Sequence, residues 1–188
     1  MKISTRQIVM AGLLSALTVT LGATGWGLIP IPTPAGAATV MHIPVIIAGI
    51  MEGPLVGAFV GLLFSLFTVQ FAPPWVVIPF RLLIGPASYF TYQFIRWSLD
   101  RLKLRLHWGS PVVAAFLAGL IGSAVNTCTL ILAVTFGLFN AATAWGIVLS
   151  SAIAEAILAA VLVGVLITPL LATTKRRQVP TKTLYKTL

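Results

Sequence analysis

The sequence is poor in the residues that build most catalytic and metal sites. Its 188 residues include three Asp or Glu, two His and one Cys. Because protein-bound metal ions need several such ligands close together, this scarcity excludes a rich metal centre. The single cysteine, Cys128, has no partner for a disulfide within the chain. We therefore expect no metal and no cofactor.

Charged residues of any kind are also scarce. They make up 8% of the chain, whereas 59% of the residues are hydrophobic. A typical soluble domain is about a quarter charged. A soluble fold of this composition would lack the polar residues to cover its surface, and the same hydrophobicity excludes intrinsic disorder. The sequence therefore predicts an all-α membrane protein.

Apolar segments that are long enough to cross a bilayer, or nearly so, recur along the chain. We interpret them as a bundle of six transmembrane helices, at about 8–21, 40–51, 54–69, 75–97, 111–136 and 145–171. The second and third helices would form a hairpin, because Gly53 suits a sharp turn and Pro54 suits the first turn of a helix. The transmembrane domain would then cover 1–173, followed by a basic cytoplasmic tail at 174–188.

The Lys and Arg residues indicate how these spans are oriented. The net charge is +9, with twelve Lys or Arg. With six spans, eleven of the twelve fall on one side, and the opposite loops, at about 22–39, 70–74 and 137–144, contain none. Because cytoplasmic loops carry the excess of basic residues, we expect both termini in the cytoplasm. Topology and anionic lipid account for these charges, so we expect no nucleic-acid partner.

A cleaved signal peptide is an alternative for the N-terminus, because residues 1–23 combine a basic start with an apolar core. Cleavage would leave five spans with the same orientation, so charge does not decide between the two. The nearest Ala-x-Ala, from Ala35 to Ala37, lies beyond the apolar run and behind three prolines. We therefore expect the first helix to be retained.

Small residues in the first span recur at intervals of four. Gly12 and Ala16 form one pair, and Ala11 and Ser15 form another. This spacing lets helix backbones approach closely in lipid. Similar stripes on other spans indicate packing within the bundle. The first span is the best candidate for contact with an external partner, because a terminal helix often has a free face.

The loop at 22–39 contains Pro30, Pro32 and Pro34 and no charged residue. Prolines at alternating positions hold a backbone extended. The loop is too long for a simple connector and too apolar for a freely solvated segment. We expect it to fold over the outer mouth of the bundle as a lid, and a passive interfacial loop is the alternative.

Three polar side chains fall inside the predicted spans, namely Arg81, Asn126 and Glu155. At about 1.5 Å per residue, Arg81 lies about 9 Å and Glu155 about 15 Å from the outer ends of their helices. Charges inside a bilayer are costly, so they face a cavity or a partner. Two interpretations stay open: Arg81 pairs with Glu155, or its guanidinium binds a substrate carboxylate through two parallel hydrogen bonds.

Other residues near the outer face complete the candidate substrate site. Thr129 follows Asn126 on the fifth span, and His42 begins the second span. Trp26 and Trp145 fall near the outer boundary, where aromatic belts form.

Several enzyme classes are excluded by what these spans do not contain. An intramembrane serine protease needs a Ser–His pair, but His42 and His107 lie at opposite faces. The chain has no phosphate-binding loop, so ATP-driven work would need another subunit. We therefore expect no enzymatic activity.

Several motifs occur in a recognisable order. They are the Ile43-Pro44 helix start, the Gly53-Pro54 turn, the Gly57 and Gly61 spacing, Pro79-Phe80-Arg81, and Gly122-Ser-Ala-Val-Asn126-Thr127. In this order, along a six-span chain of this size, they resemble the substrate-binding S components of energy-coupling-factor (ECF) vitamin transporters. The resemblance covers most of residues 5–172.

This resemblance implies a six-helix S component in the cell membrane of a prokaryote. Its substrate site would lie near the outer face, lined by helices four to six and closed by the first long loop. It would dock onto a transmembrane T component that carries two cytoplasmic ATPases. The family's Ala-x-x-x-Ala docking motif corresponds to Gly12 and Ala16, where the glycine departs from the pattern but keeps the surface small.

The resemblance does not fix which vitamin is bound. Arg81 favours an anionic substrate, and pantothenate is the first expectation. Two other classes stay open. One is a self-sufficient secondary carrier or small channel, although the chain has no clear inverted repeat. The other is an accessory membrane protein without a ligand.

Overall fold

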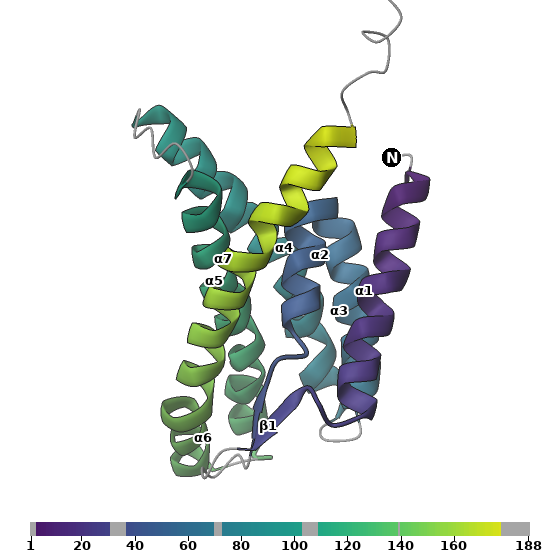
Figure 1. Cartoon of the computed structure of the whole chain (residues 1–188). Helices are drawn as coiled ribbons and strands as arrows, with labels where there is room; N and C mark the ends of the chain where they lie inside the picture. The colour runs from purple at the N-terminus through teal and green to yellow at the C-terminus, as the bar shows by residue number, and fades with distance from the viewer. Residues whose placement is uncertain (1–2, 31–36, 70–72, 103–108, 139, 178–188) are drawn as a thin grey trace, which may run out of the picture.

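The computed structural model describes residues 3–30, 37–69, 73–102, 109–138 and 140–177. Most of them are helical (Figure 1). The helices are α1 (Thr5–Ala23), α2 (Ile43–Glu52), α3 (Pro54–Thr68), α4 (Pro74–Arg101), α5 (Gly109–Thr135), α6 (Ala141–Ile147) and α7 (Ile153–Arg177). A π-helical turn, η1 (Val148–Ala152), joins α6 to α7, and strands β1 (Leu28–Pro30) and β2 (Ala37–Thr39) form a small hairpin.

The predicted helical architecture is confirmed, with the small β1–β2 hairpin as an addition that the sequence did not predict. Each predicted span coincides with a helix, and the last one coincides with α6, η1 and α7 together. Within the described residues, three segments are long and apolar enough to cross a membrane: Thr5–Ala23, Ser110–Thr135 and Ala144–Leu171. The helices α2 and α3 are apolar but shorter. The predicted domain boundary at 173 falls inside α7, and residues 178–188 of the tail lie outside the described residues.

The two ends of the bundle differ in chemistry. At one end lie the start of α1, the α2–α3 turn and the end of α7 (Figure 1). Arg6 in the first turn of α1 and Arg101 at the end of α4 lie here, and we call it the basic end. The β1–β2 hairpin and α6 lie at the opposite end, which we call the hairpin end.

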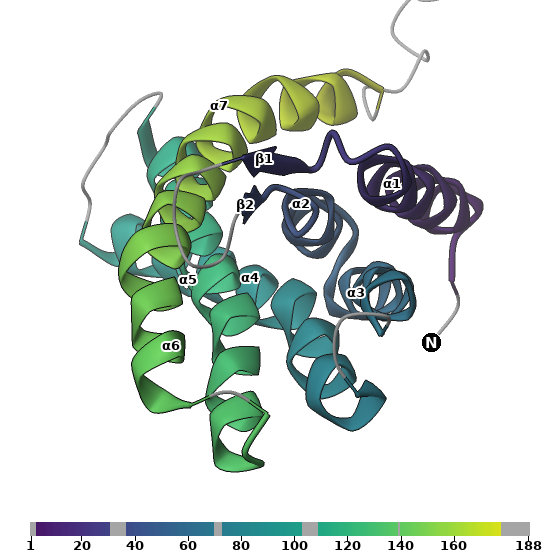
Figure 2. The same ribbon diagram turned by 90° about the horizontal axis from the view of Figure 1, so that it is seen from below.

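The helix α2 is the centre of the bundle (Figure 2). Every residue from Ile43 to Ile50 is buried, and α2 packs against α1, α3, α4, α5 and α7. A helix that is hydrophobic on all sides is one that other elements surround. The hydrophobicity of α2 on all sides therefore reflects its place inside the protein, where neighbouring helices cover it.

Glycines allow α2, α3 and α4 to touch through their backbones. A Cβ atom added to Gly57 of α3 would lie 2.8 Å from the Cα atoms of both Gly49 on α2 and Gly85 on α4. The turn between α2 and α3 needs a glycine for another reason. Gly53 has φ of 99°, a left-handed value, and Pro54 starts α3 directly after it, as the sequence predicted.

The helix α1 uses one stripe of small residues for packing and exposes the other. Its buried residues include Ser15, and Ala11 packs against the core, whereas Gly12 and Ala16 are exposed. A capping box between Ser4 and Gln7 fixes the start of the helix.

Two side chains at the start of α1 join it to the α2–α3 turn. Arg6 forms an ion pair with Glu52 at 2.6 Å, and Gln7 donates to the Glu52 carbonyl at 3.0 Å. These contacts hold the start of α1 against the turn between α2 and α3.

We predict that Gly57→Ala lowers the stability of the purified protein by about 1–3 kcal/mol, the usual cost of overpacking a tight contact. The matched control is Gly12→Ala, where an added Cβ meets nothing within 4 Å. Thermal unfolding in detergent should show a lower midpoint for Gly57→Ala and an unchanged or slightly higher one for Gly12→Ala. Equal midpoints for both variants would show that the three-glycine contact is unimportant.

Candidate functional site

Buried polar side chains from several helices gather in the half of the bundle nearest the hairpin end. Helix packing explains why they meet. Gly122 of α5 packs against Ile46 of α2 and Ser88 of α4. One helical turn closer to the hairpin end lie Asn126 on α5 and His42 at the start of α2, because residues four apart share a face. We call the group His42, Arg81, Asn126 and Glu155 the polar cluster.

Arg81 is anchored by two neighbours on α3. Its Nη1 donates to the hydroxyl of Thr68, and its guanidinium carbon lies 4.0 Å from the centroid of the Phe64 ring. A cation above a desolvated aromatic ring gains electrostatic attraction from the ring face. Thr68 in turn donates to the Phe64 carbonyl at 2.9 Å, so the anchor is itself held in place.

These anchors leave one edge of the Arg81 guanidinium chemically unsatisfied. The Nε atom is buried and has no hydrogen-bond partner among the described residues. In a guanidinium, Nε and one Nη form a fork whose two parallel N–H groups match the two oxygens of a carboxylate. The contacts with Thr68 and Phe64 thus orient the side chain without using its Nε.

Glu155 contacts the hairpin. Its side chain is buried, with 8% of the residue exposed, and Oε1 accepts the backbone N–H of Thr39 at 2.6 Å. Glu155 and Arg81 lie close enough for their charges to attract each other, but they form no ion pair. Of the two interpretations left open by the sequence, direct pairing is therefore not what the described structure contains.

His42 and Asn126 add more polar atoms without partners. His42 is fully buried, its side chain does not cap α2, and neither Nδ1 nor Nε2 has a partner within the described ranges. The same holds for Asn126 Oδ1 and Thr129 Oγ1. A buried polar group that makes no hydrogen bond costs about 1–3 kcal/mol. The polar cluster thus combines donors and acceptors that a polar ligand would satisfy.

Part of the loop that was expected to act as a lid forms the β1–β2 hairpin. The strands pair Leu28 with Thr39, Ile29 with Ala38 and Pro30 with Ala37, and β2 packs against α7 and η1. Pro32 and Pro34 lie outside the described residues. Closure over the site stays a prediction, but one end of the loop is joined to the polar cluster through Thr39 and Glu155.

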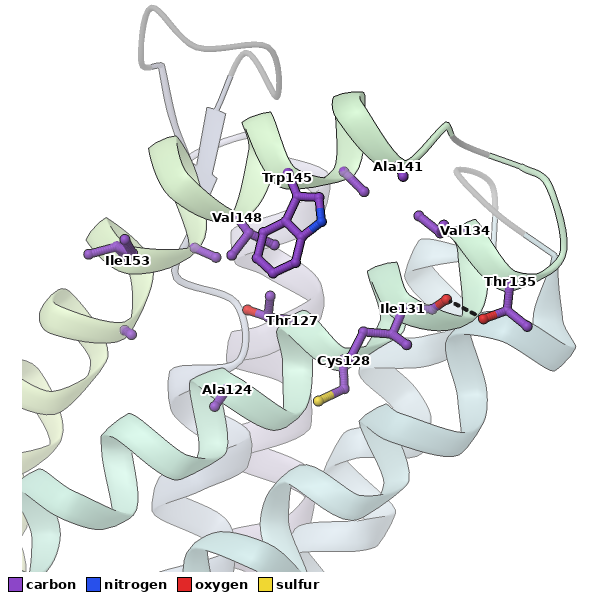
Figure 3. A pocket seen from close by; sticks show the side chains of 13 residues that line it. Ala124, Thr127, Cys128, Ile131, Val134, Thr135, Ala141, Trp145, Val148 and Ile153 are labelled. Atoms are coloured by element: carbon purple, nitrogen blue, oxygen red, sulfur yellow. Dashed lines mark hydrogen bonds between the residues drawn. The ribbon is translucent and has the colours of Figure 1, made fainter.

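The two tryptophans proposed from the sequence lie elsewhere. Trp26 precedes β1 and is 84% exposed. Trp145 on α6 lines a separate cavity of about 490 Å³ between α5 and the α6–η1–α7 segment (Figure 3). The α5 residues of this cavity, which include Thr127 and Cys128, lie on a different face of the helix from Asn126. The cavity lining is almost wholly apolar, so the polar cluster is the better candidate for a vitamin site.

Sequence reasoning missed the partners that position the charged groups. Thr68 and Phe64 lie one turn apart on an apolar helix, where nothing marks them as partners of an arginine. Thr39 contributes a backbone N–H, which any residue except proline would supply. The π-helical turn before Glu155 has no sequence signal that we recognise.

Comparison with known families identifies a match. The model of the family described as ECF transporter, substrate-specific component, matches residues 6–171. No curated protein and no solved structure matches the chain. The matched region contains every residue of the polar cluster and the exposed pair Gly12 and Ala16.

We predict that Glu155→Ala loosens the hairpin, because a hydrogen bond to a charged group contributes about 1.5–3 kcal/mol. Hydrogen–deuterium exchange should become faster in the peptide that contains Thr39. The control Glu52→Ala removes the Arg6 ion pair at the basic end and should leave exchange at Thr39 unchanged. Unchanged exchange at Thr39 in Glu155→Ala would mean that this contact does not hold the hairpin.

Proposed function

Because the family match spans most of the chain, this protein belongs to the substrate-specific components of ECF transporters, and we propose that it captures a water-soluble vitamin or precursor. Members of this family are transport subunits and integral membrane proteins rather than enzymes. We place the protein in the plasma membrane of a prokaryote, with the hairpin end outside and the basic end in the cytoplasm. Both termini would then be cytoplasmic.

A six-span topology requires α4 to cross the membrane although it carries charges. Two exposed tryptophans, Trp75 and Trp97, support this. They lie about 33 Å apart along the helix at about 1.5 Å per residue. This separation is close to the hydrocarbon thickness of about 30 Å. Aromatic side chains prefer the two membrane–water interfaces, so the pair marks both ends of a span.

The observation that carries the proposed substrate site is the buried Nε of Arg81 with no partner among the described residues. A carboxylate placed against this edge would neutralise the guanidinium and complete its hydrogen bonds. Amide or hydroxyl groups of the same molecule would suit Asn126 Oδ1 and the ring nitrogens of His42. Pantothenate combines a carboxylate with an amide and hydroxyl groups, and we propose it as the first candidate among anionic vitamins.

The hairpin supplies a cover for this site. Since Thr39 is bonded to Glu155, the strand β2 is attached to the wall of the polar cluster. We propose that the loop at 22–39 closes over a bound vitamin while this contact keeps its C-terminal strand in place. Trp26, exposed before β1, would move with the closing part of the loop.

We propose that ATP hydrolysis by other subunits drives import, since this sequence has no phosphate-binding loop of its own. We propose that the exposed face of α1 docks onto a transmembrane T component that carries two cytoplasmic ATPases. Gly12 and Ala16 present a flat surface there, next to the exposed side chains of Leu13 and Leu17. Small residues let a partner helix approach closely.

We predict that Arg81→Ala weakens the binding of pantothenate to the purified protein by roughly 10- to 100-fold, the effect of losing a charge-assisted hydrogen bond. Isothermal titration calorimetry gives the affinity, and Arg81→Lys should restore part of it. The control is Arg96→Ala, another partly buried arginine of α4, which stacks on Tyr92 near the basic end. Equal affinities for Arg81→Ala and wild type would refute the carboxylate contact.

We predict that Ala16→Leu prevents docking while the vitamin affinity stays unchanged, because the added side chain holds the partner helix away. The measurement is co-purification with the co-expressed T component and ATPases. Ala154→Leu, an exposed alanine on α7, is the matched control and should co-purify normally. Uptake that persists without the ATPases would instead identify a self-sufficient carrier.

A further inference from the structure

The cavity between α5 and α6 has no role in the proposed vitamin site. Its lining residues are Ala124, Thr127, Cys128, Ile131, Val134, Thr135, Ala141, Ala144, Trp145, Val148, Ala152, Ile153 and Ala156. The Thr127 hydroxyl donates to the Ser123 carbonyl and the Thr135 hydroxyl to the Ile131 carbonyl. Both hydroxyl protons are therefore used within α5, and the cavity offers a polar ligand little to bind.

The cavity is continuous with the outward surface of the bundle. Ile131, which lines it, is 63% exposed, and Ile153 on the opposite wall is 50% exposed. Leu149 and Ile157, on the same segment of η1 and α7, are also exposed. Both walls belong to segments that are long and apolar enough to span a membrane. In the membrane placement proposed above, the opening therefore faces lipid hydrocarbon.

We propose that this cavity is a binding site for one acyl chain of a membrane phospholipid. The chain would lie between α5 and α6, in contact with Ile131 and the small side chains of Ala124 and Ala156. Dispersion contacts with the walls drive such binding, since a lipid tail and an apolar cavity differ little in polarity.

Trp145 determines which part of the lipid lies at the mouth. Its ring projects from α6 toward α5 across the cavity (Figure 3), and the residue is 65% exposed. Indoles prefer the interface, where the ring contacts hydrocarbon and the N–H meets polar groups. The Trp145 N–H would donate to an ester carbonyl of the lipid at the mouth of the cavity. The acyl chain would then extend from this point into the cavity.

The alanines of the lining allow a direct test by native mass spectrometry of the full chain released from mild detergent. The variant Ala124→Phe/Ala156→Phe fills the cavity, and Ala154→Phe adds the same ring at an exposed position outside it. We expect wild type and Ala154→Phe to retain one phospholipid more than the double variant does. Equal retention by all three proteins would overturn the proposal.

Cys128 provides a second test that needs no substitution, because it is the chain's single cysteine and lines the cavity. We expect phosphatidylglycerol with long acyl chains to slow maleimide labelling of the delipidated protein several-fold. A short-chain analogue with the same headgroup should leave the rate unchanged. Equal slowing by both lipids would indicate headgroup binding and overturn the acyl-chain site.

Pantothenate separates this proposal from the vitamin site. If pantothenate slows Cys128 labelling and long-chain lipid does not, the cavity belongs to the vitamin site and the acyl-chain proposal is wrong. If long-chain lipid protects Cys128 and the short-chain analogue does not, the proposal stands, whether or not pantothenate binds in calorimetry.

Discussion

The contact of three glycines on α2, α3 and α4 is the constraint on which the rest of the bundle depends. Helices in lipid gain little from hydrophobic burial against one another, so they associate through close packing. Gly49, Gly57 and Gly85 bring three backbones together where any Cβ would collide. This approach encloses α2 and brings the Arg81 segment of α4 alongside α3. The anchoring of Arg81 by Thr68 and Phe64 follows from that approach.

A partly buried arginine such as Arg81 persists in such a bundle only if its charge is compensated. Thr68 supplies one hydrogen bond, Phe64 supplies the negative face of a ring, and Glu155 attracts the cation from a distance. A direct ion pair with Glu155 would satisfy the guanidinium more fully and leave it no role in ligand binding. Because Glu155 bonds to Thr39 instead, the two charges stay separate and a carboxylate ligand can complete the set.

The sequence predicted the helices well because their signals are local. Each predicted apolar segment coincides with a helix, and Gly53-Pro54 located the turn between α2 and α3. It also identified Asn126 and Glu155 as buried and Arg81 as partly buried, since polar residues stand out in apolar runs. It did not predict the Thr39–Glu155 bond, because a backbone N–H carries no residue signal and the two lie 116 positions apart. The π-helical turn and the cavity beside it depend on how α6 packs, which the sequence does not show.

The helix α5 lies between the polar cluster and the apolar cavity, and different residues of the helix face each of them. Asn126 faces the centre of the bundle with its Oδ1 unpartnered in the described structure, whereas Thr127 turns toward the cavity with its hydroxyl bonded to its own helix. Adjacent residues on a helix point about 100° apart, so neighbours in sequence can lie on different faces. The proposed vitamin site and the proposed acyl-chain cavity can therefore share one helix. A polar vitamin that passed from the polar cluster through the α5 wall into the bilayer would lose its hydrogen bonds. Because the cavity on the other side of α5 offers few replacements, this passage would be costly.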